Sequence, residues 1–293
     1  MIHRYQKKGL NFVLDVNSGA VHLLDDISYA VSGLIDENMT EKCPESVVEA
    51  LPQYAADDVR EAYGELYELK KAGQLFAEDD YIDVSRYIPV GAPVKALCLH
   101  VAHDCNLRCK YCFASTGDFG QGRKIMPPEV AKKAIDFVIA RSGKRRNIEV
   151  DFFGGEPLMA WDTVTQTVDY ARSIEEQHGK KFRFTITTNG LLLDEDKRRY
   201  INENMDNCVL SLDGRREVND EFRKTVAGTG SYDTIVPKFK ALVDERDPNL
   251  DYYARGTFTS HNLDFANDVL SIADAGFDRL SVEPVTAAPG CGY

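Results

Sequence analysis

Residues 101–113 read VAHDCNLRCKYCF, and this stretch places Cys105, Cys109 and Cys112 on one short segment. The chain begins MIHRYQKKGLNFVLDV, without the apolar run and small-residue cleavage site of a signal peptide. Nowhere do 18 apolar residues follow one another, so we expect a cytoplasmic protein that does not enter a membrane. Because disulfides are rare in a reducing compartment, three cysteines this close together indicate a metal or redox site.

The composition is that of an ordinary globular protein with a substantial core. The chain has 293 residues, of which 43% are hydrophobic and 28% are charged, enough for one large domain or a large and a small one. Its net charge of -12 is uneven, because residues 1–86 hold 8 Lys and Arg against 17 Asp and Glu, a net charge of -9. A negative surface repels phosphate backbones, so we expect no nucleic-acid partner, whereas a peptide with basic residues fits.

Residues 1–86 are predicted to form a small domain of one hairpin and three helices. Two β-rich runs, NFVLDV and AVHLL, flank the turn-forming triplet Asn17-Ser18-Gly19. The helices are expected over residues 27–35, 44–51 and 57–72. Asp25 or Asp26 can cap the first helix, and Gly73 can end the third. This arrangement resembles a winged helix-turn-helix, but its charge disfavours DNA, so we expect its exposed sheet edge or helix groove to hold a peptide.

A second unit, residues 87–293, follows a linker. Residues 81–93, YIDVSRYIPVGAP, contain two prolines and a glycine. Strands are then expected over 94–102, 147–153, 182–188, 207–212, 251–259 and 278–285, and helices over 128–141, 161–177, 194–204, 232–245 and 263–275. Such alternation implies right-handed parallel crossovers, and six of these units make an α/β fold, a partial (βα)6 TIM-like barrel. In a barrel the chemistry lies at the C-terminal ends of the strands.

The cysteine segment follows the first barrel strand with the spacing Cys-x3-Cys-x2-Cys. Three thiolates on one loop can hold three irons of a [4Fe–4S] cube and leave the fourth iron open. An open iron can chelate the amino and carboxylate groups of S-adenosylmethionine (SAM) and pass an electron into its sulfonium. The spacing resembles the signature of radical SAM enzymes, with Tyr111 as the aromatic residue that lies near the adenine in that family. A structural zinc site, with His100 or His103 as the fourth ligand, is the alternative.

Motifs at the ends of later strands extend the resemblance. Gly154 and Gly155 allow a ligand to approach the backbone, and Glu156 offers a carboxylate to an ammonium group. Gly-Gly-Glu is similar to the family motif for the methionyl amino group of SAM. Further positions that resemble SAM contacts are Asn189 in TTNG, and Ser211 and Asp213 in LSLDG. Turn chemistry is the alternative for these motifs, since Asn-Gly and Asp-Gly are strong turn pairs.

Charged side chains and single cysteines complete the candidate set. Arg223 resembles the position from which an arginine faces the SAM carboxylate in related maturases; Arg255 is a rival, and a surface ion pair is the alternative for both. Glu283 is costly inside an otherwise apolar strand unless it is paired or faces a cavity, so we expect it on the substrate side. Cys98 and Cys208 stand alone and are expected in the core. The sequence assigns no catalytic residue.

The whole chain is similar to the maturases of six-cysteine peptides (SCIFF peptides). The most specific segment is HDCNLRCKYCFASTGDFG, and the first unit is similar to a PqqD-like recognition domain. The resemblance implies that a short ribosomal precursor peptide binds the N-terminal domain and that a cysteine sulfur is joined to a threonine carbon as a thioether. It also implies a [4Fe–4S] cluster, SAM and a reductant such as flavodoxin or ferredoxin.

Alternatives within this resemblance stay open. Family members continue into a cysteine-rich SPASM domain with two auxiliary clusters, whereas this chain stops at Tyr293 with only Cys291 near its end, so we expect that domain to be absent or truncated. One alternative is a radical SAM maturase of another peptide or protein, of the sulfatase-maturase or quinone-cofactor type. The other is a non-catalytic module whose N-terminal unit binds a leader peptide.

Overall fold

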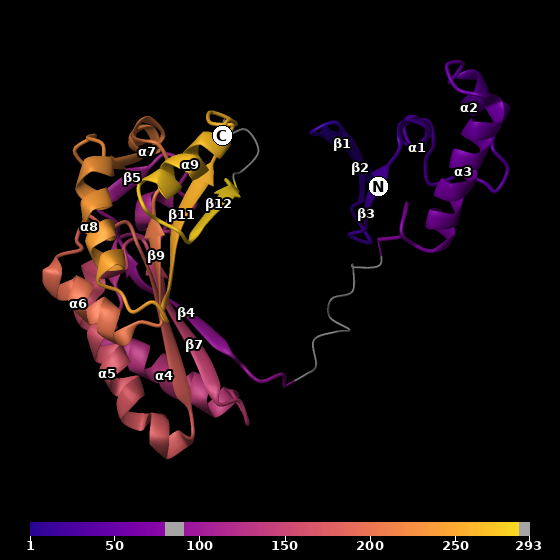
Figure 1. Cartoon of the computed structure of the whole chain (residues 1–293). Coiled ribbons are helices and arrows are strands. Elements are labelled where there is room, and N and C mark those ends of the chain that lie inside the picture. Colours follow the sequence, from indigo (N-terminus) through magenta and orange to yellow (C-terminus); the bar gives the residue numbers. More distant parts are fainter. Residues whose placement is uncertain (80–90, 287–293) are drawn as a thin grey trace. The chain divides into compact units, whose positions relative to one another are not determined.

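The computed structural model describes residues 1–79 and 91–286. The chain divides into two compact units, Met1–Ala92 and Pro93–Tyr293 (Figure 1). The predicted boundary between residues 86 and 87, most of the predicted linker and Cys291 lie outside the described residues. Within the described ranges, every helix is too short or too polar to cross a membrane.

The first unit contains a three-stranded antiparallel sheet in the order β1 (Ile2–Lys7), β2 (Leu10–Asp15), β3 (Val21–Leu24). The predicted hairpin is confirmed, with Phe12 opposite Leu23, and its turn contains Gly19 at a φ of 73°. Strand β1 lies outside the predicted elements, because its mostly exposed side chains do not alternate between apolar and polar. It joins β2 through Lys8 and Gly9, both at positive φ, as in the two-residue turns that suit twisted hairpins.

Three helices share a core with this sheet: α1 (Asp26–Val31), α2 (Glu45–Glu49) and α3 (Ala56–Lys71). The side chain of Asp25 accepts a hydrogen bond from the backbone N–H three residues on at 2.7 Å, so the predicted cap is confirmed. The predicted extent of this helix to residue 35 is wrong. The carbonyl of Tyr29, to which Gly33 would donate in the next turn, accepts from Arg4 at 2.7 Å instead. Helix α3 ends before Gly73, whose φ is 68°, as predicted.

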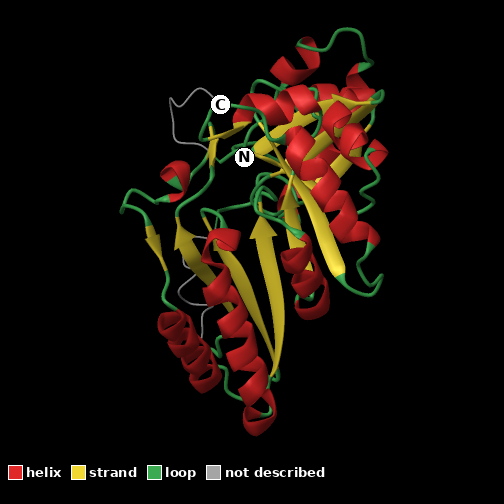
Figure 2. Ribbon diagram, turned by 90° about the vertical axis from the view of Figure 1, so that its left-hand side faces the viewer, coloured by secondary structure: helices red, strands yellow, loops and turns green. Residues whose placement is uncertain are grey.

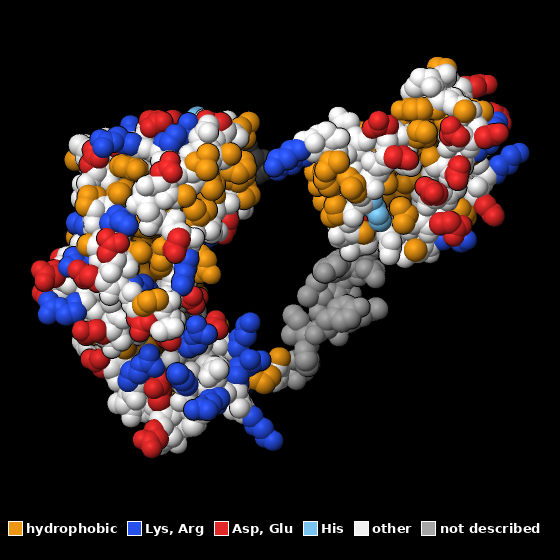
Figure 3. Space-filling view, viewed as in Figure 1, with side chains coloured by type: hydrophobic (Ala, Val, Ile, Leu, Met, Phe, Trp, Pro, Cys, Tyr) orange, Lys and Arg blue, Asp and Glu red, His pale blue; other side chains and the backbone are white. Residues whose placement is uncertain are grey.

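The first unit has an open sheet edge beside apolar side chains. Strand β3 is an end strand, and nothing pairs with its outer edge among residues 1–79 and 91–286. Two apolar side chains of β3 face solvent, Val21 at 57% and Leu23 at 61% exposure. Figure 3 shows hydrophobic and acidic side chains next to one another on the visible face of this unit. An unpaired edge of this kind can accept a further strand.

The second unit is built on a seven-stranded sheet in which six strands are parallel. Their order is β12-β11-β9-β8-β7-β4, and β6 joins the β4 edge antiparallel. The strands are β4 (Ala96–His103), β6 (Lys124–Ile125), β7 (Asn147–Gly154), β8 (Lys181–Thr188), β9 (Asn207–Ser211), β11 (Asp251–Phe258) and β12 (Leu280–Pro284). The α/β fold with a mostly parallel sheet is therefore as predicted, and the six predicted strands lie within a few residues of their expected positions.

Helices follow these strands and cover one face of the sheet. They are α4 (Pro128–Arg141), α5 (Trp161–His178), α6 (Glu195–Asn204), α8 (Tyr232–Asp244) and α9 (Ala266–Asp274). Figure 2 views the sheet with helices in front of the strands. Along β8, Phe182, Phe184 and Ile186 are buried in the core that the sheet shares with the helices, while the side chains between them are exposed or half-buried. Because alternate residues point to opposite faces, the second face of the sheet is left to line a cavity.

Several short elements of the second unit lie outside the prediction. They are β5 (Leu107–Cys109), α7 (Arg216–Phe222), β10 (Arg223–Thr225) and single 3-10 turns at Ser115–Gly117 and Pro157–Ala160. Strands β5 and β10 pair antiparallel, which sets Cys109 opposite Arg223. Segments this short carry no periodic pattern, so only the folded chain reveals them.

The two single cysteines of the sheet differ from each other. Cys208 is fully buried in the core, as predicted. Cys98 is exposed, so its predicted place in the core is wrong. Its neighbour Leu99 belongs to the buried core, and Cys98 therefore points to the face of the sheet that the helices do not cover.

Candidate functional site

A cavity of about 510 Å³ lies at the C-terminal ends of the parallel strands. The residues predicted to bind cofactors line it together: Cys105, Cys109, Tyr111, Cys112, Gly154, Gly155, Glu156, Asn189, Ser211 and Arg223. Asp213 lies behind this wall and accepts a hydrogen bond from Tyr111, 102 positions away in the chain. Parallel strands bring their carboxyl ends to one edge of the sheet, which is why such distant segments meet here.

The loop that carries the cysteines is fixed by the guanidinium of Arg108. This group donates to the carbonyl oxygens of Cys105 at 2.5 Å and Leu107 at 2.7 Å. Cys109 is held by the ribbon in which it faces Arg223. Burial raises the pKa of the Cys105 thiol to about 12. A bound metal group would stabilise the thiolate form of this side chain.

The zinc alternative requires ligands that converge on one point. Among the residues that the structure describes, no group of three or more His, Cys, Asp or Glu side chains is arranged to hold a single metal ion. Zinc needs its ligands within ~2.3 Å of one point, whereas a cube binds each thiolate at a different iron, so the thiolates need not converge. The rings of His100 and His103, the expected fourth ligands, each lie 4.8 Å from the ring of Phe119. The arrangement favours a cluster over a single ion.

The two glycines let the end of β7 touch the cysteine loop. A Cβ at Gly154 would lie 2.4 Å from the carbonyl oxygen of Ala102, and a Cβ at Gly155 would lie 2.2 Å from that of Asp104. The N–H of Gly155 donates to Ala102 at 2.7 Å, and the N–H of Glu156 donates to Asp104 at 2.9 Å. Gly154 also has a φ of 129°. Both positions require glycine because the chain's own backbone approaches here.

The carboxylate of Glu156 is buried and largely occupied by the protein itself. It accepts hydrogen bonds from the N–H of Leu158 at 3.0 Å, the hydroxyl of Thr188 at 2.8 Å and the N–H of Asn189 at 2.7 Å. Burial raises the pKa of Glu156, and these donors oppose the shift. The side chain thus ties the end of β7 to the end of β8, and about one of its four lone-pair sites remains for an ammonium group.

Asn189 reaches from the end of β8 to the cysteine loop. Its Nδ2 donates to Oδ1 of Asn106 at 2.8 Å and lies 3.6 Å from the sulfur of Cys105. Its Oδ1 accepts from the N–H of Leu191 at 3.0 Å, which is turn chemistry. Asn189 therefore serves the turn and the site together. Ser211, at the end of β9, is half-buried in the cavity wall.

Tyr111, Asp213 and Arg223 form a polar triad beside the cysteines, in which the aspartate and the arginine are buried. The hydroxyl of Tyr111 donates to Asp213 at 2.6 Å and accepts from Arg223 at 2.7 Å, and the guanidinium lies 3.7 Å from the carboxylate. Burial raises the pKa of the Tyr111 hydroxyl, which stays neutral and is the donor. The Nε of Arg223 is buried and has no hydrogen-bond partner within the described part of the chain. Arg223 also lines the cavity. Since an unpaired buried donor is costly, a bound anionic group would satisfy this nitrogen.

Arg255 and Glu283 face the cavity from β11 and β12 and form an ion pair. The hydrogen bond from Arg255 lowers the pKa of Glu283, so its carboxylate stays charged. The hydroxyl of Ser281 donates to the same carboxylate at 3.2 Å. Pairing and exposure offset the cost of a glutamate in this strand. The side chain of Arg255 is 44% exposed, against 10% for Arg223, so the two arginines occupy different environments.

Sequence reasoning missed other residues of the wall. Phe113, Phe153, Thr187, Thr188 and Thr257 also line the cavity. The threonines stand at the carboxyl ends of strands, and the rule that identified Asn189 would also find them. The N–H of Thr257 donates to Asp213 at 3.1 Å, a contact for which the sequence contains no signal.

The chain matches a protein family and several known proteins. The family model described as the Radical SAM superfamily matches residues 99–252. The radical SAM cyclopropyl synthase TigE of Paramaledivibacter caminithermalis is 29% identical over 199 residues, which are 64% of this chain and 40% of that protein. A cysteine-type anaerobic sulfatase-maturating enzyme of Clostridium novyi is 29% identical over 143 residues, which are 47% of this chain and 37% of that enzyme.

Solved structures share the fold. Native anSMEcpe with bound AdoMet, which is SAM, matches with a TM-score of 0.59 at 22% identity, over 67% of this chain and 52% of that chain. The same protein with AdoMet and the Cp18Cys peptide matches with a TM-score of 0.58. This chain spans about half or less of the length of these relatives. The family match covers more than half of the 293 residues, and the chain belongs to the radical SAM superfamily, enzymes that bind a [4Fe–4S] cluster and SAM.

Proposed function

We propose that this chain is a radical SAM maturase that joins a cysteine sulfur to a threonine carbon in a ribosomally made, cysteine-rich peptide. The observation that carries the proposal is a cavity in which three cysteines, a glycine pair and a buried arginine meet. The similarity of HDCNLRCKYCFASTGDFG to the six-cysteine peptide maturases supports this peptide class. Relatives named as maturating enzymes, and a solved neighbour with a bound peptide, support action on a polypeptide.

The residues of the cavity fit both cofactors. Cys105, Cys109 and Cys112, which line the same cavity, would each hold one iron through a thiolate. The unpaired Nε of Arg223 would receive the carboxylate of SAM, and the remaining lone pair of Glu156 its ammonium group. When bound, the cluster and SAM supply a 5′-deoxyadenosyl radical that takes a hydrogen atom from the substrate.

The other wall residues would orient SAM. Asn189 and Ser211 offer hydrogen bonds from the ends of β8 and β9, and the backbone at Gly154 and Gly155 keeps the cysteine loop against the sheet. Tyr111 would lie near the adenine, with its hydroxyl already engaged by Asp213 and Arg223. The exposed Arg255–Glu283 pair would face the substrate.

The proposed cross-link removes two hydrogens from the peptide. The threonine carbon loses a hydrogen atom, which ends on 5′-deoxyadenosine, and the cysteine thiol loses a proton to solvent. As the sulfur–carbon bond forms, one electron passes to the oxidised form of a one-electron carrier of the flavodoxin or ferredoxin class. It balances the electron that a reductant such as flavodoxin or ferredoxin supplies at the start of the turnover, so the cross-link consumes no net external electron.

We also propose a partial (βα)6 barrel for the second unit and a PqqD-like winged helix for the first. The support for the barrel is that each parallel strand pairs with the next parallel strand along the chain. The support for a peptide site is the open edge of β3, flanked by exposed Val21 and Leu23. A precursor peptide would add to this edge as a fourth strand, with its backbone giving affinity and its side chains giving specificity.

Anaerobic turnover tests the proposed function. The protein is reconstituted with iron and sulfide, reduced in the presence of SAM and a cysteine-rich precursor peptide, and analysed by liquid chromatography and mass spectrometry. We expect 5′-deoxyadenosine, and a peptide that is lighter by two hydrogens and has lost one alkylatable thiol. Cys105→Ala should abolish both products. A protein that releases no 5′-deoxyadenosine is the non-catalytic module, and the proposal fails.

The second candidate is oxidation of a cysteine in a protein substrate, which the names of the sulfatase-maturating relatives favour. A cysteine-containing sulfatase peptide is therefore supplied in a parallel reaction. If that peptide is oxidised while the cysteine-rich peptide stays unchanged, the second candidate replaces the first.

A further inference from the structure

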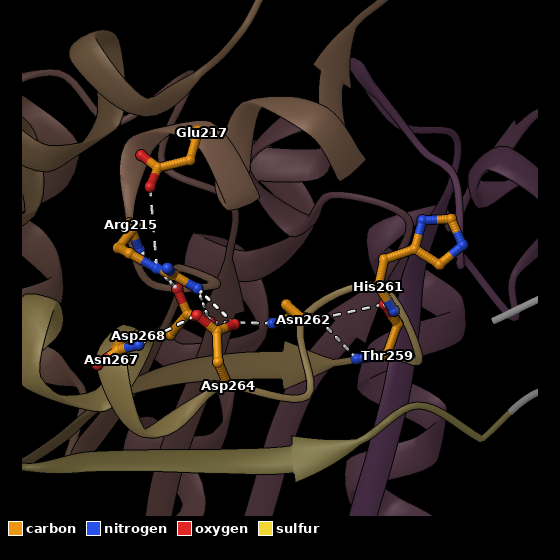
Figure 4. A network of polar contacts seen from close by, with 8 residues as sticks. All are labelled: Arg215, Glu217, Thr259, His261, Asn262, Asp264, Asn267 and Asp268. Atoms are coloured by element: carbon orange, nitrogen blue, oxygen red, sulfur yellow. Dashed lines mark hydrogen bonds and ion pairs between the residues drawn. The ribbon is translucent and has the colours of Figure 1, made fainter.

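Asp268 of α9 is a fully buried carboxylate that joins two loops. Its Oδ1 accepts from the backbone N–H of Arg215 at 3.1 Å and from the Nε of Arg215 at 2.8 Å, and its Oδ2 accepts from Asn262 at 3.0 Å. Figure 4 shows these side chains converging around the Arg215 guanidinium. Asn262 in turn accepts from the N–H of Thr259 at 2.8 Å. Asp268 therefore connects the loop after β9 with the loop after β11, two neighbouring strands.

The turn between Asp213 and Arg215 lies directly against this carboxylate. A Cβ at Gly214 would lie 2.2 Å from the Cβ of Asp268, and Gly214 has a φ of 119°. The turn is sharp and tightly packed, so the position of its last residue, Arg215, depends on the hydrogen bond from the Arg215 N–H to Asp268. At its start, the carboxylate of Asp213 accepts from the N–H of Thr257 at 3.1 Å. Both ends of the turn are thus fixed by groups on or beside β11 and α9.

We propose that Asp268 is a positioning residue for SAM binding. By holding the turn at Arg215 it sets the place of Asp213, and Asp213 orients Tyr111 and Arg223 at the cavity wall. The inference rests on the proposed role of Arg223 in receiving the SAM carboxylate.

The burial of Asp268 restricts the turn to one arrangement. The side chain of Asp268 has 0% exposure and that of Arg215 has 26%, and an uncompensated buried charge is strongly unfavourable. Alternative positions of the turn that would break the pair are therefore rarely populated. A shift of Asp213 would move the guanidinium of Arg223, whose Nε is the unpaired donor in the wall.

Asp268→Asn tests the proposal because it keeps the size of the side chain but replaces one acceptor oxygen by an NH2 donor. This donor would face the N–H groups of Arg215 or Asn262, so one hydrogen bond would be lost. The reconstituted protein is assayed for iron content, for thermal unfolding and for SAM binding by equilibrium dialysis. We expect the Kd for SAM to rise about ten-fold at unchanged iron content. A residue with a merely structural role would lower the melting temperature without changing the affinity of the folded protein.

Asp264→Asn is the matched control. Asp264 also accepts from Arg215, at 2.8 Å, but its side chain is 53% exposed. Within the described residues, no backbone N–H of the turn donates to it. The Asp264→Asn protein should bind SAM with an affinity within about two-fold of wild type, because exposed ion pairs contribute little. Wild-type affinity in Asp268→Asn, or an equal loss in both variants, overturns the proposal.

Arg215→Lys carries the test if Asp268→Asn does not fold. It keeps the positive charge and the backbone hydrogen bond, but it loses the forked contact that fixes the turn. We expect weaker SAM binding at unchanged iron content, and wild-type affinity in this variant overturns the proposal. A wild-type protein that binds SAM but modifies no cysteine-rich peptide would refute the proposed thioether chemistry and leave this inference intact.

Discussion

Replacing Gly155 by alanine tests how the end of β7 meets the cysteine loop. The added Cβ would lie 2.2 Å from the carbonyl oxygen of Asp104, 2.6 Å from its carbonyl carbon and 2.9 Å from the carbonyl oxygen of Gly117. All three atoms belong to the backbone, so no side chain can turn away to make room. The first distance has to grow to the 3.4 Å of ordinary van der Waals contact, and the cysteine loop and the strand therefore have to move apart.

The expected cost follows from this overpacking. Extra atoms in a well-packed site destabilise a protein by about 1–3 kcal/mol, and Gly155→Ala should lower the free energy of unfolding by this amount. The chain has one tryptophan, Trp161 at the start of α5, so its fluorescence in a urea titration reports on the second unit alone. Displacement of the loop should also reduce the iron bound after anaerobic reconstitution.

Gly64→Ala is the matched control for this substitution. Gly64 lies inside α3, and nothing stands within 4 Å of the position of its Cβ. Alanine should stabilise the helix by about 1 kcal/mol, measured by circular dichroism, and should leave the iron content unchanged. The two substitutions add the same methyl group, but they are expected to change the stability of the protein in opposite directions. Wild-type stability and full iron content in Gly155→Ala would refute the steric reasoning.

Other single contacts lead to smaller expectations. Asp194→Ala removes the N-cap of α6, which accepts from the N–H of Lys197 at 2.9 Å, and should cost about 1 kcal/mol in urea titrations. The hydrogen bond from the Lys197 side chain lowers the pKa of Asp194 below 3.8. The stability that this carboxylate contributes is therefore present above pH 3.8 and is lost as the pH falls through the folded-state pKa. If Asp194→Ala costs the metal-free protein as much stability in acid as at neutral pH, this assignment is contradicted. Tyr111→Phe removes the hydroxyl between a carboxylate and a guanidinium, and should weaken SAM binding in equilibrium dialysis without loss of iron; unchanged affinity would speak against the triad. Cys208→Ser should destabilise the buried core by about 1–3 kcal/mol. Cys98→Ser, at an exposed thiol, should change the melting temperature little. Equal losses of stability in the two variants would show that the two environments are wrongly assigned.

The regular elements of the second unit could be predicted because their patterns are long. Helix α4 begins and ends at the predicted residues 128 and 141, since a proline pair marks its start and apolar residues recur with helical spacing. Strand β8 alternates strictly and was predicted within one residue. Strand β1 was missed because its side chains are mostly exposed and carry no alternation.

The site could be predicted only in part. The rule that strand ends carry the chemistry collects residues such as Asn189 and Ser211 without knowledge of their contacts. The partners of those residues depend on the folded chain: Glu156 was expected to face a ligand, but three donors of the protein occupy most of its carboxylate. The contact between Asp268 and Arg215 joins positions 53 apart, and no local pattern marks it.

The most direct test is electron paramagnetic resonance of the reduced, anaerobically reconstituted protein with and without SAM. The central claim is that Cys105, Cys109 and Cys112 hold a cluster of which one iron is left for SAM. The claim predicts about four irons per chain, a [4Fe–4S] signal that changes when SAM is added, and loss of the signal in Cys109→Ala. One bound zinc ion without iron, or a cluster signal that SAM leaves unchanged, would contradict it.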